Sequence, residues 1–237
     1  ADTIDALVAL GALQTVPWYS WEGKFFYDYY GSDVIPEQKA PQGRALVPKY
    51  PDPSKHWHPK NGGNGAELIR QLRVALDAHE IPALTRHRVE RVITNDAGEV
   101  VGVEASLRKG GIVSVRARKA IIFATGGFTH NKEYRNNFLR GPIFGGCAAP
   151  TNEGDFIKIG GALGAAMGNL THAWWVQQTL ELALEFSSTP TGIWAVPGDS
   201  MAQVNKYGRR FMNEKFLYNE RTQLHFDWDP IKAEYPN

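Results

Sequence analysis

The sequence is poor in cysteine, in net charge and in long apolar runs, and each shortage excludes a class of protein. Cys147 is the single cysteine among 237 residues, so the chain cannot form a disulfide within itself, which is typical of a reducing compartment. Apolar runs are all shorter than the roughly 20 residues that a helix needs to cross a bilayer. The formal net charge at pH 7 is only +1, which favours neither nucleic acid nor a charged membrane surface as a partner. We therefore expect a cytoplasmic protein with no nucleic-acid partner and no membrane span.

Several motifs of enzymes and metal sites are also missing. The chain has no G-x-S-x-G of a hydrolase, no C-x-x-C and no H-E-x-x-H. His56 and His58 lie two residues apart without a neighbouring cysteine or carboxylate triad, so we predict no metal site. No G-x-G-x-x-G follows a predicted strand. The chain begins with Ala1 rather than methionine, and we expect it to be a piece of a longer protein.

An apolar stretch that ends in two glycines is the most informative feature that is present. Residues 120–124 read Ala-Ile-Ile-Phe-Ala, which predicts a short strand buried on both faces. Thr125-Gly126-Gly127 then ends the stretch, and glycine permits both positive φ and the close approach of another molecule. In α/β proteins a ligand usually binds where a buried strand ends. A plain strand followed by a turn would give the same local pattern.

The chain around this stretch predicts further helices and strands. Apolar residues recur at helical spacing after Asn64, a good N-cap, until Ile81-Pro82. Branched residues between 89 and 115 are interrupted by the turn sequences Asn95–Gly98 and Lys109–Gly111, which predicts a three-stranded β-meander. Other helices are expected at residues 3–15, at residues 131–139, and from about Asp155 to a C-cap at Gly168.

Two blocks follow the glycine pair in a characteristic order. The first reads Pro150-Thr-Asn-Glu-Gly-Asp155, and the second reads Val204-Asn-Lys-Tyr-Gly-Arg-Arg-Phe-Met-Asn-Glu214. Together with Ala-Thr-Gly-Gly, they resemble the flavoprotein family of fumarate reductases, succinate dehydrogenase flavoprotein subunits and 3-ketosteroid dehydrogenases. The resemblance runs from roughly Asn61 to the C-terminus. Phe156 departs from the family pattern, in which the first block ends in a further glycine.

The resemblance implies a fold, a cofactor and a set of cofactor contacts. The fold would be α/β, with part of a Rossmann-like FAD-binding domain over residues 61–172 and the start of an α+β cap domain over 173–237. Residues 1–60 would form an aromatic and Pro-rich segment on the substrate side. The cofactor would be FAD, with its adenine against the backbone of Val89. The other implied contacts are Ala124, Thr125, Gly126, Gly127, Asn152, Gly154 and Asp155.

The resemblance also implies two catalytic residues, Tyr218 and Arg221, which follow Glu214 by four and seven residues. Near the position of Tyr218, fumarate reductases carry an arginine of a proton relay, and ketosteroid dehydrogenases carry a tyrosine that acts as base. Tyrosine is a weak base at its free pKa of about 10, so a cation such as Arg221, Arg209 or Arg210 would have to lie nearby. Alternatively, Tyr218 is a surface residue and Glu214 pairs with Arg210.

These features lead us to expect an FAD-dependent oxidoreductase that acts on a CH–CH bond next to a carbonyl, in the manner of the 3-ketosteroid dehydrogenases. Such a dehydrogenase or ene-reductase moves a hydride between flavin and carbon. Aromatic residues in Trp18–Tyr30 and at Trp174-Trp175 favour an apolar carbonyl substrate. A packed edge of the core is the alternative interpretation of Trp18–Tyr30, and the one that we favour. The sequence does not indicate the electron partner. A non-catalytic binding or scaffold protein on the same fold is the alternative, favoured by the missing G-x-G-x-x-G and by Phe156.

Overall fold

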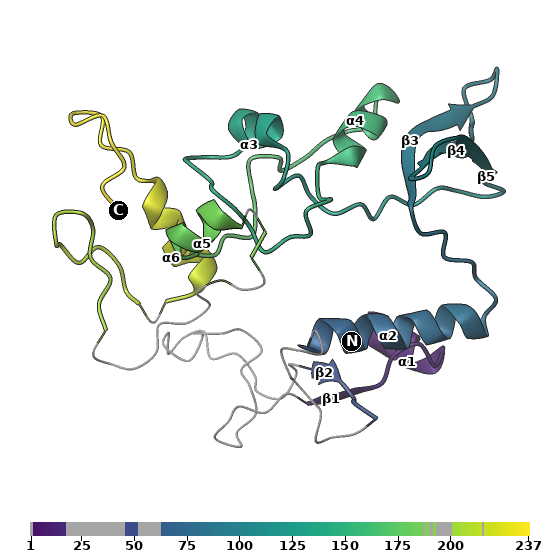
Figure 1. Ribbon diagram of the computed structural model, residues 1–237, viewed down its shortest axis with the longest axis horizontal. Helices are drawn as coiled ribbons and strands as arrows, with labels where there is room; N and C mark the ends of the chain where they lie inside the picture. Colours follow the sequence, from purple (N-terminus) through teal and green to yellow (C-terminus); the bar gives the residue numbers. More distant parts are fainter. Residues whose placement is uncertain are drawn as a thin grey trace. The chain divides into compact units, whose positions relative to one another are not determined.

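The chain mixes helices and strands, in agreement with the expected α/β class (Figure 1). The computed structural model describes residues 2–17, 46–51, 63–186, 188–189, 192, 201–214 and 216–237. The chain divides into two compact units, Ala1–Thr85 and Arg86–Asn237. The aromatic stretch Trp18–Tyr30 and the histidines His56 and His58 lie outside the described residues. The domain boundaries near residues 60 and 172 stay a prediction.

The described residues of the first unit form two helices and a two-stranded sheet. The elements are α1 (Asp2–Ala9), β1 (Thr15–Pro17), β2 (Leu46–Pro48) and α2 (Gly63–Ala78). Strands β1 and β2 are antiparallel, with Val16 opposite Val47. The first helix ends earlier than predicted because Gly11 adopts a left-handed φ of 68°, which is a common way to stop a helix. The chain then turns, and Thr15 belongs to a strand instead of to the helix.

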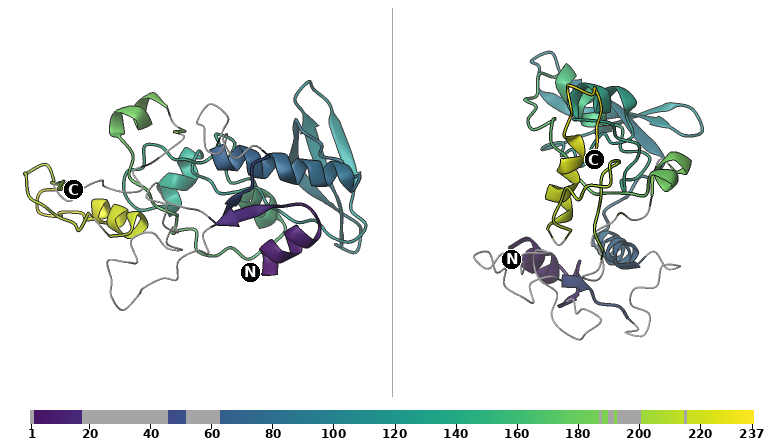
Figure 2. Two further views of the ribbon diagram at one scale, coloured as in Figure 1. Left: turned by 90° about the horizontal axis from the view of Figure 1, so that it is seen from below. Right: turned by 90° about the vertical axis from the view of Figure 1, so that its left-hand side faces the viewer.

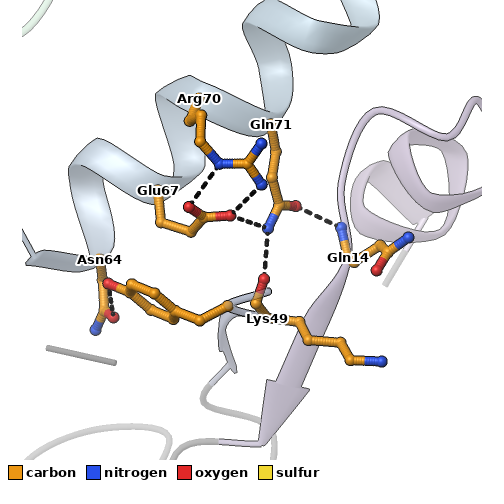
Figure 3. Close-up of polar contacts among 7 residues, drawn as sticks. Gln14, Lys49, Asn64, Glu67, Arg70 and Gln71 are labelled. Carbon is orange, nitrogen blue, oxygen red and sulfur yellow. Dashed lines mark hydrogen bonds and ion pairs between the residues drawn. The ribbon is translucent and has the colours of Figure 1, made fainter. Parts of the chain in front are cut away.

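Helix α2 begins at Gly63, so the prediction that Asn64 is its N-cap was wrong. Asn64 lies in the first turn, and its Oδ1 accepts a hydrogen bond from the hydroxyl of Tyr50 at 3.1 Å (Figure 3). Ala75 is buried on this helix, whereas Ile69 is exposed. The apolar face is therefore narrower than the sequence pattern indicates.

A buried carboxylate on α2 organises the polar contacts of the first unit (Figure 3). Glu67 accepts hydrogen bonds from Arg70 at 2.7 Å and from Gln71 at 2.9 Å. Gln71 also donates to the carbonyl of Lys49 at 2.9 Å and accepts from the backbone N–H of Gln14 at 2.7 Å. The hydrogen bond from Arg70 is the main cause that lowers the pKa of Glu67. One glutamine thus joins α2 to the ends of both strands.

The second unit begins with a three-stranded antiparallel sheet (Figure 2). Its strands are β3 (His87–Thr94), β4 (Val100–Leu107) and β5 (Ile112–Arg116), paired in that order. The register shifts between Val89 and Arg91, and such a bulge bends a strand locally. At the first turn, Asn95 Oδ1 accepts from the backbone N–H groups of residues 97 and 99 at 3.1 and 2.9 Å, an arrangement that asparagine favours.

Residues 120–124 form no strand, so this prediction was wrong. The side chain of Ile122 is 90% exposed. The aromatic ring of Phe123 does pack, with its centroid 5.2 Å from that of Phe156. A strand needs a neighbouring strand to satisfy its backbone groups, and none of the described residues pairs with this stretch. The apolar sequence indicates a buried strand but does not supply its partner.

Short helices follow in the second unit. They are α3 (Lys132–Phe138), α4 (Asp155–Ala162), α5 (Leu180–Glu185) and α6 (Tyr218–Gln223), which continues into the 3-10 helix η5 (Leu224–Phe226). The expected start of α4 near Asp155 is confirmed, but the helix ends at Ala162 and not at Gly168. Gly164 has a φ of 76°, which interrupts the helical path earlier. Among the described residues, no helix is long and apolar enough to span a membrane.

Candidate cofactor and substrate site

Two of the segments predicted to contact FAD are hydrogen-bonded to each other. The backbone N–H of Gly154 donates to the carbonyl of Gly127 at 3.0 Å, and that of His130 donates to the carbonyl of Asn152 at 3.0 Å. The side chain of Asn152 lies over Gly126, where an added Cβ would be 2.8 Å from its Nδ2. Residues 124–127 and 152–155 therefore form one surface, which we call the glycine platform.

The three glycines of the platform differ in what surrounds them. Gly126 and Gly154 have φ values of 72° and 81°, and a Cβ at Gly154 would lie 2.8 Å from the Cβ of Phe128. Both positions therefore require glycine for the fold itself. A Cβ at Gly127 would meet no atom within 4 Å. Ala124, Thr125 and both neighbouring glycines are exposed, so this part of the platform is open to solvent.

The third predicted segment, at Val89, is next to a residue that bonds the Asn152–Asp155 turn. Arg88 Nη2 donates hydrogen bonds to Glu153 Oε2 and to Asp155 Oδ1, both at 2.7 Å. Asp155 and then Glu153 are the main causes that raise the pKa of the Arg88 guanidinium. A cavity of about 200 Å³ lies here, and its walls are formed by Arg88, Val89, Glu90, Asp155, Lys158 and Ile159. Val89 and the turn thus share one small cavity.

Phe156, the departure from the family pattern, packs within its own part of the fold. Its ring lies against Phe123 and over Gly160, one turn further along α4. A Cβ at Gly160 would be 2.6 Å from Phe156 Cε2, so the glycine provides the space for the ring. The residue that replaces the usual glycine is therefore accommodated by a second glycine four positions later.

The two predicted catalytic residues share helix α6 but have different partners. The Tyr218 hydroxyl oxygen accepts a hydrogen bond from Trp174 Nε1 at 2.7 Å, and the side chain of Trp174 is 80% exposed. Arg221 is only 1% exposed. Its Nε donates to Gln177 Oε1 at 3.0 Å, and its Nη1 donates to the carbonyl of Glu214 at 2.9 Å. Tyr218 is therefore half-buried beside an exposed tryptophan, whereas Arg221 is fully buried.

A histidine also belongs to the polar group that Arg221 and Gln177 form. Gln177 Oε1 faces the guanidinium of Arg221, so its Nε2 must be the atom that lies 2.6 Å from His225 Nε2. His225 Nε2 then accepts this hydrogen bond, which requires a neutral imidazole. Burial is the main cause that lowers the pKa of His225, in agreement with the neutral form.

Glu214 pairs with Arg210, as the alternative interpretation of this region predicted. Its Oε2 lies 2.5 Å from Arg210 Nη2, and its Oε1 accepts the backbone N–H of Gln203 at 2.7 Å. The hydrogen bond from Arg210 and then that from Gln203 lower the pKa of Glu214 to about 2. The carboxylate therefore stays ionised and fixes the start of the segment that leads into α6.

This ion pair gives a testable dependence of stability on pH. The pKa of Glu214 falls from 4.5 to about 2 in the folded chain, so its contribution is present above about pH 4.5 and is lost as the pH falls toward 2. We expect Glu214→Gln to flatten the fall of the unfolding free energy over this range, as measured by urea denaturation at several pH values. Glu104→Gln, which removes the partner of Arg91 on the sheet, is the control. Equal pH slopes for wild type and Glu214→Gln would contradict the assignment.

A larger cavity, which the sequence did not predict, lies beside α6. Its volume is about 730 Å³, within the range of ligand sites in proteins. The lining is mostly apolar, with two arginines and one carboxylate: Arg210, Phe211, Met212, Asn213, Phe216, Glu220, Arg221 and Leu224. Within the described part of the chain, Glu220 Oε2 is buried and has no hydrogen-bond partner. The sequence signal nearest to this cavity is the block Val204–Glu214, which ends just before α6.

Comparison with known families shows the class to which the chain belongs. Residues 39–229 match the model of the family described as FAD binding domain. The chain therefore belongs to this family, which confirms the resemblance of the sequence motifs and identifies FAD as the cofactor.

Individual relatives lie within the same group of flavoproteins. The chain is 34% identical over 176 residues to 3-oxosteroid 1-dehydrogenase of Mycobacterium tuberculosis, covering 67% of this chain and 28% of that protein. It is 27% identical over 173 residues to 4-oxocyclohexanecarboxylate 2-dehydrogenase of Sinomonas cyclohexanicum, covering 70% and 29%. The chain thus spans less than a third of the length of these curated relatives.

A solved structure shows the same fold. The 3-ketosteroid-Δ4-(5α)-dehydrogenase from Rhodococcus jostii RHA1, in complex with 4-androstene-3,17-dione, superposes with a TM-score of 0.67 at 23% identity. The match covers 95% of this chain and 44% of that one.

Proposed function

We propose that this chain is part of an FAD-dependent dehydrogenase or ene-reductase that acts on a CH–CH bond next to a carbonyl. The observation that carries the proposal is that the turn at residues 152–155 is bonded to the open backbone at Gly127 and shares a small cavity with Val89 through Asp155. Relatives named as dehydrogenases of 3-oxosteroids and of 4-oxocyclohexanecarboxylate support a carbonyl-containing substrate.

In this proposal the FAD lies along the glycine platform. Val89 contacts the adenine through its backbone, and the platform residues Ala124, Thr125, Gly126, Gly127, Asn152, Gly154 and Asp155 contact the rest of the cofactor. FAD supplies the site that accepts or donates the hydride. Residues 61–172 then belong to a Rossmann-like FAD-binding domain, and residues 173–237 begin the cap.

The substrate would bind beside α6, at the cavity of about 730 Å³ that Arg221 lines. Tyr218, three residues earlier on the same helix and outside that lining, would carry the proton. Phenylalanine, methionine and leucine side chains suit an apolar ring system, and Arg210, whose side chain is 62% exposed, can orient a carbonyl oxygen. Bound FAD would supply the hydride acceptor. Tyr218, once its own hydroxyl proton has passed to solvent, would accept the proton from the neighbouring carbon. Trp174 donates to the Tyr218 oxygen and so stabilises the negative charge that forms when Tyr218 loses its own proton. Arg221 would not touch the substrate. Its hydrogen bond to Gln177 holds α6, and so Tyr218, in place.

The test is an absorbance spectrum of the purified full-length protein, followed by anaerobic addition of a 3-ketosteroid. We expect the two visible flavin bands, and we expect the steroid to bleach them as the flavin is reduced. Fumarate added to the chemically reduced protein is the control, because a dicarboxylate reductase would reoxidise its flavin. A colourless protein that takes up no added FAD would overturn the proposal and favour a non-catalytic binding protein on the same fold.

A further inference from the structure

Arg88 makes a contact in the cofactor region that no sequence motif indicates. One nitrogen of its guanidinium, Nη2, bonds two carboxylates at 2.7 Å, and these carboxylates flank Gly154 on either side. Arg88 comes from β3, whereas Glu153 and Asp155 come from the turn that begins α4. The contact therefore fixes the turn of the glycine platform against the strand that carries Val89.

The arrangement has an electrostatic consequence for an anionic cofactor. Glu153 and Asp155 place two negative charges at the start of α4, where backbone N–H groups and the helix dipole would otherwise attract an anion. FAD carries a pyrophosphate, so two unpaired carboxylates here would repel it. Lys158 lines the same 200 Å³ cavity, and together with Arg88 it offsets the charges of Glu90 and Asp155.

The position of Arg88 also affects the path of strand β3 at Val89. Val89 is the next residue, and the bulge between Val89 and Arg91 interrupts the regular pairing with β4 at this point. A bulged strand end has fewer ladder hydrogen bonds to hold it, so a side-chain tether on the adjacent residue has more influence on its path. Asp155 is held by Arg88 through one oxygen, Oδ1.

We propose that Arg88 is a positioning residue for FAD: it holds the Glu153–Asp155 turn against β3 at Val89 and neutralises the two carboxylates so that an anionic dinucleotide can approach. This inference rests on the proposed function of the chain. Arg88 need not touch the cofactor, and its effect should appear in FAD affinity more than in folding, because its side chain is 52% exposed and exposed ion pairs contribute little to stability.

The experiment compares Arg88→Gln with Arg91→Gln in the full-length protein. Arg91 lies on the same strand, is 59% exposed and also pairs with a carboxylate at 2.7 Å, that of Glu104, so it is a matched control outside the platform. The dissociation constant of FAD is measured on the FAD-depleted protein from the change in flavin fluorescence at low and at high salt. We expect Arg88→Gln to weaken binding by about tenfold at low salt and by less at high salt. Arg91→Gln should stay within about twofold of wild type.

A second substitution separates charge neutralisation from loss of a tether. Adding Glu153→Gln to Arg88→Gln removes one of the two unpaired charges and should recover part of the FAD affinity. Glu153→Gln alone removes one negative charge but keeps the bond from Arg88 to Asp155, so it should bind FAD more tightly than wild type at low salt. Recovery in the double variant excludes a folding defect in Arg88→Gln. If wild type binds FAD and Arg88→Gln binds it equally well, the inference fails while the proposed function stands. If wild type binds no FAD, the proposed function fails and the inference with it.

Discussion

Replacing Tyr218 by phenylalanine is expected to lower kcat for dehydrogenation by about 10²- to 10⁴-fold, the usual contribution of a side chain that transfers a proton. The substitution removes only the hydroxyl, whose oxygen accepts from Trp174 at 2.7 Å. The helix should survive, because the backbone carbonyl of Tyr218, which accepts from Thr222 Oγ1, is unchanged. FAD binding should also be unchanged, since the glycine platform has no part in this contact.

The measurement is the anaerobic rate of flavin reduction by a 3-ketosteroid in a stopped-flow instrument. Tyr207→Phe is the control. This substitution also removes one hydrogen-bonded hydroxyl, which in Tyr207 is bonded to the carboxylate of Glu234. Tyr207 lies on a turn before α6 and not on the helix itself. The rate of Tyr207→Phe should equal that of wild type. A Tyr218→Phe protein that reduces its flavin at the wild-type rate would remove Tyr218 from the mechanism and leave it as a structural residue.

Features set by neighbouring residues were predictable from the sequence. The turn at Asn95–Gly98 forms as expected because one asparagine side chain bonds two nearby N–H groups and Gly98 supplies a φ of 80°. Helix α3 likewise has Asn131 as its N-cap, bonded to the N–H of Tyr134 at 3.1 Å. In both cases the energy comes from atoms within four residues of each other, so a local pattern is sufficient.

Features set by distant partners were not predictable in the same way. The apolar stretch 120–124 has the side chains of a buried strand but no described strand beside it. The contacts of Arg88 with Glu153 and Asp155 join residues 65 and 67 positions apart, and Arg221 meets Gln177 across 44 positions. The order of the motifs was sufficient to predict the two platform segments, because each segment is a motif of a few adjacent residues. The arginine that ties the platform to β3 and the cavity beside α6 depend on side chains that only the folded chain brings together.

Substitution of Gly127 by valine gives the sharpest test of the cofactor site. A Cβ at this position meets no atom within 4 Å, and its φ lies outside the left-handed region. The folded chain should therefore tolerate valine with no change in its thermal unfolding. FAD lying along the open backbone would meet the new side chain, and overpacking costs about 1–3 kcal/mol, which corresponds to roughly 5- to 150-fold weaker binding.

Two other glycines make the result specific. A Cβ at Gly168 also meets nothing within 4 Å, and its φ is not left-handed, but it lies outside the platform; Gly168→Val should change neither stability nor FAD affinity. Gly154→Ala should destabilise the fold by about 1–3 kcal/mol, because alanine is strained at a φ of 81° and its Cβ would clash with Phe128. Among these three glycine substitutions, only Gly127→Val is expected to weaken FAD binding without changing stability. Flavin titration and thermal unfolding of the same samples measure the two effects. If Gly127→Val binds FAD as tightly as Gly168→Val does, the cofactor does not pass over this backbone, and its contacts must be sought at the cavity that Val89 and Asp155 line.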